Sequence, residues 1–105
     1  MGNSPRQAYE QSCRQIIAES ETRLEKLRHL VERSRPHQRE AIERQLDQLR
    51  GSVNRARART EAIHSAPDAS WNFARMGADE AMTELQSGVS ELEGQLNELM
   101  SQPAS

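Results

Sequence analysis

Apolar and small residues recur at alternating spacings of four and three residues in three separate stretches of this chain. Each stretch contains seven such positions, which we call seam positions. They are Cys13, Ile17, Ser20, Leu24, Leu27, Val31 and Ser34; Ile42, Leu46, Leu49, Val53, Ala56, Thr60 and Ile63; and Ala78, Met82, Leu85, Val89, Leu92, Leu96 and Leu99. The alternation is the a/d pattern of a heptad repeat, which keeps one narrow side of a helix against a partner helix. The pattern therefore predicts three long helices that pack lengthwise.

The composition agrees with a thin core rather than a thick one. Only 34% of the 105 residues are hydrophobic, and only three are aromatic. Each set of seam positions covers 22 residues, or about 32 Å of helix. Equal helices joined by short turns predict an all-α fold, an antiparallel three-helix bundle or coiled coil, that forms a single helical domain over residues 1–105.

Prolines and capping residues set the expected boundaries. We expect helices over residues 5–34, 37–64 and 67–100, with tails at 1–4 and 101–105. Ser4 is the predicted N-cap of the first helix, with Pro5 at the first helical position. Ser65 and Asp68 have the spacing of a capping box before the third helix.

The break between the first two helices is predicted by Pro36. A proline disfavours the helical conformation in the preceding residue, and the eight residues from Ser34 to Ile42 exceed one heptad. The alternative is one long kinked helix over residues 5–63 that pairs with the third helix in an oligomer, because no glycine marks the junction.

Charge is distributed unevenly along the chain. Residues 1–60 carry 13 basic and 8 acidic side chains, whereas residues 61–105 carry 1 basic and 8 acidic side chains. Opposite charges favour packing of the third helix against the first two. Polar seam positions such as Ser20 and Thr60 contribute little burial, so we expect self-association into a homo-oligomer. A single cysteine cannot form an internal disulfide, and no apolar stretch is long enough to cross a membrane, which favours a cytoplasmic location.

No pattern typical of an active site or a metal site is present in the sequence. The three histidines are scattered, and no serine lies in a nucleophile-elbow motif. Acidic pairs such as Asp79-Glu80 belong to one helix surface rather than to two sides of a cleft. We therefore expect no enzymatic activity, no metal and no cofactor.

Two groups of residues are candidates for binding. The arginines between residues 50 and 59 have no acidic neighbours within that segment and are candidates for anion contact: Arg50, Arg55, Arg57 and Arg59. Their near-alternate spacing spreads them around a helix, and an acidic third helix lies in the same chain, so we expect nucleic acid not to be the partner. The acidic third helix with its narrow seam equally disfavours a membrane surface.

Trp71 and Phe73 stand at the start of the third helix, and both have two interpretations. They are expected to close one end of the core. The alternative is an interaction surface, because tryptophan often anchors protein interfaces. Small residues in this helix, including Gly77 and Gly88, would let a neighbouring helix approach closely.

Two stretches resemble the coiled-coil stress-response proteins related to a cyanobacterial salt-stress protein. The residues that carry the resemblance are Ala69-Ser70-Trp71, Gly77 and Ala81-Met82-Thr83-Glu84-Leu85, and, less strongly, Tyr9, Ile16, Leu24, Leu27, Glu40-Ala41-Ile42 and Leu46-Asp47-Gln48-Leu49-Arg50. The chain departs from the family pattern in having no tryptophan in its first helix, Met82 in place of a later tryptophan, and Pro36 within a region the family often keeps helical. The resemblance implies a small cytoplasmic, helical, non-enzymatic protein linked to stress, with no catalytic residues.

These observations predict a non-enzymatic coiled-coil interaction protein that binds another protein or itself. The alternative hypothesis is a nucleic-acid- or anion-binding module that uses the Arg50–Arg59 segment.

Overall fold

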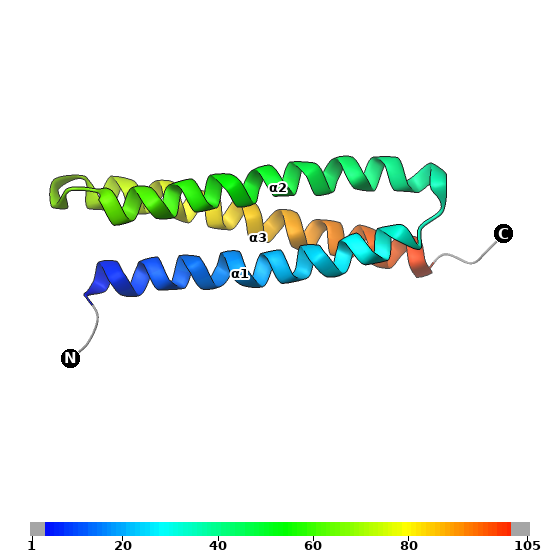
Figure 1. Cartoon of the computed structure of the whole chain (residues 1–105), viewed down its shortest axis with the longest axis horizontal. Coiled ribbons are helices and arrows are strands. Elements are labelled where there is room, and N and C mark those ends of the chain that lie inside the picture. Colours follow the sequence, from blue (N-terminus) through cyan, green and yellow to red (C-terminus); the bar gives the residue numbers. More distant parts are fainter. Residues whose placement is uncertain (1–3, 102–105) are drawn as a thin grey trace.

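The computed structural model describes residues 4–101, so most of both predicted tails lies outside the described residues. Its helices are α1 (Pro5–Glu32), α2 (Pro36–Ser65) and α3 (Trp71–Ser101), and a short 3-10 helix, η1 (Asp68–Ser70), precedes α3. α1 and α3 run in the same direction and α2 runs opposite to both, in an elongated bundle of 59 × 25 × 16 Å (Figure 1). The described residues contain no strand, and the prediction of an antiparallel three-helix bundle is confirmed.

The turn between α1 and α2 breaks the helix as predicted, so the alternative of one continuous kinked helix is wrong. Arg35 is extended, with φ −65° and ψ 143°, and Pro36 begins α2. Arg39 reaches back from α2, and its Nη2 donates to the carbonyl oxygens of Glu32 and Ser34 at 2.9 and 3.1 Å. These bonds satisfy carbonyl groups that the end of α1 leaves without helical partners.

The first helix begins as the sequence predicts. The backbone N–H of Gln7 donates to the Ser4 hydroxyl oxygen, and the backbone N–H of Ser4 donates to the Gln7 side-chain oxygen, each at 3.2 Å. This reciprocal pair is a capping box, and Pro5 occupies the first turn.

The capping box predicted for Ser65 and Asp68 is wrong. Ser65 is the last residue of α2, and neither η1 nor its N-cap Pro67 has a side-chain capping bond. Ala66 precedes the proline and is extended, with φ −69° and ψ 133°, so α2 ends one residue before it. Asp68 instead pairs with Arg6 of α1 at 3.1 Å, and α3 starts at Trp71 rather than near residue 67.

The seam forms the core. Nineteen of the 21 seam positions are buried, and the remaining two, Ser34 and Leu99, are half-buried. Each buried Leu or Ile contributes about 1.5–3 kcal/mol. Thr60 is tolerated there because its hydroxyl group donates to the Ala56 carbonyl oxygen at 2.8 Å.

Ion pairs on the surface join α3 to both other helices. Arg23 of α1 pairs with Glu93, and Arg55 of α2 pairs with Glu84 at 2.6 Å. Each contact is worth up to about 1 kcal/mol, so the pairs orient the helices more than they stabilise them. Among the described helices, none combines the length and the hydropathy needed to cross a membrane.

Candidate interaction surface

One end of the bundle is closed by an aromatic cluster around Trp71. The indole ring is half-buried against the core and meets the Tyr9 ring edge-to-face, with centroids 5.7 Å apart and planes at 80°. The Arg6 guanidinium carbon lies 5.3 Å from the centroid of the indole ring. Arg6 also donates to the Ala66 carbonyl oxygen and pairs with Asp68. Trp71 thus ties the start of α1 to the start of α3, as the expected end closure requires.

Tyr9 adds a second tie between α1 and α3. Its hydroxyl group hydrogen-bonds to the Asp79 carboxylate, and its oxygen lies 3.2 Å from the Arg75 carbonyl oxygen. Burial and the neighbouring Asp79 carboxylate raise the pKa of Tyr9 well above its ordinary value. The phenol therefore stays protonated and acts as a donor.

Phe73 does not close the end of the core, and for this residue that expectation is wrong. Its side chain is 83% exposed. Residues two apart on a helix point about 200° apart, so Trp71 and Phe73 cannot face the same neighbour. Met76 lies three residues after Phe73, on the same side of α3, and is 66% exposed.

Phe73 and Met76 border a hollow of about 1040 Å³ between the end of α2 and the start of α3. We call it the α2–α3 groove. Its lining residues are Arg59, Ala62, Ala66, Ser70, Phe73, Ala74, Met76, Gly77, Asp79, Glu80, Thr83 and Glu84. The alanines leave the hollow open because they carry small side chains, whereas the Arg59 side chain lies against Gly77. A surface with both protruding and recessed apolar parts can receive a helix from a partner.

Two of the four charged side chains that line the α2–α3 groove are engaged within the chain. Asp79 accepts from Tyr9, and Glu84 pairs with Arg55. The side chains of Arg59 on α2 and Glu80 on α3 have no ion pair or hydrogen bond among the described residues. Arg59 reaches across to α3, since a Cβ atom at Gly77 would lie 3.7 Å from the Arg59 Cδ atom.

The other candidate arginines are divided among different partners. Arg50 pairs with Asp47 on its own helix at 3.1 Å, and Arg57 pairs with Glu21 of α1 at 2.6 Å. Arg55 turns to α3. The structure therefore does not bring the four arginines into one patch, and three of them already have carboxylate partners.

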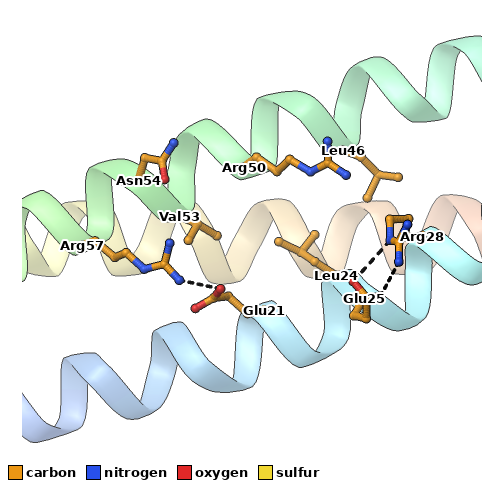
Figure 2. Close-up of a pocket in the computed structure, with 9 residues that line it drawn as sticks. All are labelled: Glu21, Leu24, Glu25, Arg28, Leu46, Arg50, Val53, Asn54 and Arg57. Carbon is orange, nitrogen blue, oxygen red and sulfur yellow. Dashed lines mark hydrogen bonds and ion pairs between the residues drawn. The ribbon is translucent and has the colours of Figure 1, made fainter.

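A second groove lies between α1 and α2, and we call it the α1–α2 groove (Figure 2). It is smaller, at about 300 Å³, and is lined by Arg28, Arg50 and Arg57 around an apolar floor that includes Leu24 and Leu46. Figure 2 shows the Arg57–Glu21 pair, which joins α2 to α1 across this groove, and the Arg28–Glu25 pair, which lies within α1 beside it. Since each of these arginines has a carboxylate neighbour, the positive charge in this groove is largely neutralised.

Sequence reasoning missed one charged residue in the core. Glu10 is buried, three residues before Cys13, where the heptad spacing continues to another seam position. Its carboxylate accepts from Arg14 at 2.8 Å and lies 3.2 Å from Nδ1 of His64 in the last turn of α2. Arg14, with a smaller effect from His64, lowers the pKa of Glu10 despite its burial. Extending the heptad by one step would have identified this position.

The remaining groups that could support chemistry are isolated. No cluster of three His, Cys, Asp or Glu residues able to hold a metal ion occurs within residues 4–101. Cys13 is a buried free thiol, and burial raises its pKa, which disfavours the reactive thiolate. Met76 and Glu80 were also not predicted as site residues. Met76 was detectable from its spacing to Phe73, whereas the absence of a partner for Glu80 depends on side-chain positions.

Comparison with protein-family models, curated protein sequences and solved structures finds no significant match to this chain.

Proposed function

We propose that this chain is a non-enzymatic helical interaction protein, and that the α2–α3 groove is the surface by which it binds another protein or itself. The observation that carries the proposal is the exposure of Phe73 and Met76 beside a hollow lined with small residues. Neither side chain occupies a seam position, so the bundle does not require them. Adjacent exposed apolar side chains are costly in water and are a recognised mark of interaction surfaces.

The stress-related role and the cytoplasmic location form part of this proposal. The resemblance supports the first. The second is supported by the single buried cysteine, which has no disulfide partner within the described residues and suits a reducing compartment.

The nucleic-acid- or anion-binding alternative is less well supported because Arg50, Arg55 and Arg57 are each paired with a carboxylate. A titration with single-stranded RNA separates the two hypotheses. We expect no binding even at low salt, whereas binding that weakens steeply with added salt would favour the alternative.

Site-specific photo-crosslinking tests the proposed surface. A photoreactive amino acid replaces Met76 in the α2–α3 groove or, as a matched control, Asn54, which is exposed in the α1–α2 groove on the same bundle. We expect discrete covalent protein adducts from position 76 in cells and none from position 54. Adducts from position 54 alone would contradict the proposal.

A further inference from the structure

We propose that the α2–α3 groove is occupied by a second copy of this chain, in a two-fold symmetric dimer in which each copy inserts Phe73 and Met76 into the groove of the other. This inference rests on the proposed function and specifies its partner. Three properties of the groove support it: its shape, the charges left over within it, and the completeness of the bundle beneath it.

The shape of the groove is complementary to itself. Phe73 and Met76 protrude from α3, while the small residues Ala62 and Ala66 form the recess beside them. In a two-fold interface the same patch lies on both sides, so each protrusion must find a recess within that patch. This surface contains both parts, whereas a surface adapted to an unrelated helix needs only the recess.

The charge of the groove is also self-complementary. With Asp79 and Glu84 engaged within the chain, the charged side chains of the groove that have no partner among residues 4–101 are Arg59 on the α2 wall and Glu80 on the α3 wall. A two-fold axis that lies in the plane of the surface and runs along the groove makes the two copies face each other, and it places the α2 wall of one copy over the α3 wall of the other. It therefore brings Arg59 of one copy towards Glu80 of the other, and the reverse. A strongly acidic or strongly basic partner would leave one of these charges unpaired in a desolvated interface.

The dimer is expected to be reversible rather than obligatory. The seam is already buried within one chain, so each copy folds before it associates. Association then depends on a few apolar side chains and two symmetric ion pairs, which predicts a dimer that forms as the concentration rises.

Sedimentation equilibrium of the full chain over a wide concentration range tests the inference. We expect a monomer–dimer equilibrium for the wild-type chain. The double change Phe73→Glu and Met76→Glu should weaken dimerisation by at least about tenfold, because it places charge in the apolar centre of the interface. The matched control is Met100→Glu, an exposed methionine at the other end of α3, which should leave the equilibrium unchanged. Circular dichroism checks that all three chains remain equally helical.

A charge-exchange experiment tests the pairing between copies. Arg59→Glu alone places two carboxylates opposite each other, and Glu80→Arg alone places two guanidinium groups opposite each other, so each variant should dimerise less than the wild type. An equimolar mixture of the two should recover dimers that contain one copy of each, since both pairs are then attractive. Ion pairing within one chain cannot produce this recovery.

The outcomes separate this inference from the broader proposal. A wild-type chain that stays monomeric, a Met100→Glu effect as large as that of the double change, or a mixture that associates no better than its components would each overturn the dimer. If the chain is monomeric but position 76 still crosslinks to a different protein, the proposed function stands and only the identity of the partner is wrong.

Discussion

The seam and the α2–α3 groove both contain apolar side chains of α2 and α3, yet these side chains differ in their exposure to solvent. Seam residues such as Ile63 and Leu85 are fully enclosed by neighbouring helices, whereas Phe73 and Met76 are exposed to solvent. The difference follows from heptad position, because side chains at the a/d spacing face a partner helix and those outside it do not. Hydrophobicity alone therefore does not identify the residues that hold this bundle together.

The largest expected effect comes from placing a charge in the seam. Leu92→Asp, and equally Leu46→Asp, buries a carboxylate without a partner. The cost of more than about 4 kcal/mol consumes much of a typical domain's stability, so the helical circular dichroism signal should be lost. Phe73→Asp is the matched change in the groove and should retain full helicity. Equal helicity in Leu92→Asp would contradict the seam assignment.

The next largest effect on stability is expected from truncating the two aromatic residues at the start of α3. Trp71→Ala removes the ring packed on Tyr9 and under Arg6, and should lower the free energy of unfolding by about 2–4 kcal/mol. Phe73→Ala should change it by less than about 0.5 kcal/mol, because an exposed ring loses few contacts. Chemical denaturation measures both values. A reversed order would mean that Phe73 rather than Trp71 closes the bundle.

Glu10 tests whether a charged side chain can serve as part of the seam. Its pKa is lower in the folded chain than its ordinary value of 4.5, so the carboxylate stabilises the fold above that value and this contribution is lost as the pH falls through the folded pKa. The wild-type chain should lose stability below about pH 4.5 more steeply than Glu10→Gln, in which the neutral amide has no charge to lose. Thermal unfolding at several pH values measures this difference. Parallel pH profiles of the two chains would show that Glu10 does not contribute to the pH dependence of stability.

The smallest effect on stability is expected from replacing two glycines of α3 by alanine. A Cβ atom added at Gly94 would have no neighbouring atom within 4 Å. Gly94→Ala should therefore stabilise the chain by about 0.5–1 kcal/mol through helix propensity. At Gly88 a Cβ atom would overlap the Leu49 Cδ2 atom, so Gly88→Ala should stabilise the chain less than Gly94→Ala, or destabilise it, because Leu49 must move. Equal stabilisation at both positions would indicate that Leu49 moves without cost.

The fold could be predicted because it depends on periodicity and on proline. The heptad spacing located almost every buried residue, and Pro36 located the first turn. The second turn was predicted less well, since Ser65 and Asp68 match a capping motif that the extended Ala66–Pro67 pair prevents.

The candidate site could be predicted only in part. The spacing of Trp71 and Phe73 already implied that they face different sides of α3, and the sequence singled out both. The heptad pattern sets which side of each helix faces inward, but the pairing of Arg55 and Arg57 with carboxylates of different helices depends on the conformations of long side chains and on the lengthwise alignment of the helices. The same holds for Arg59 and Glu80, which have no partner within residues 4–101. A single sequence contains no direct signal of either property.

The methionine methyl groups report directly whether the chain binds through the α2–α3 groove rather than through the seam or another surface. Met76 lies in the groove, Met82 lies in the seam, and Met100 is 60% exposed at the far end of α3. Nuclear magnetic resonance of methyl-labelled methionine across the concentration range of association should move the Met76 resonance and leave those of Met82 and Met100 in place. A Met76 resonance that stays constant while that of Met100 moves would show that the chain binds through another surface.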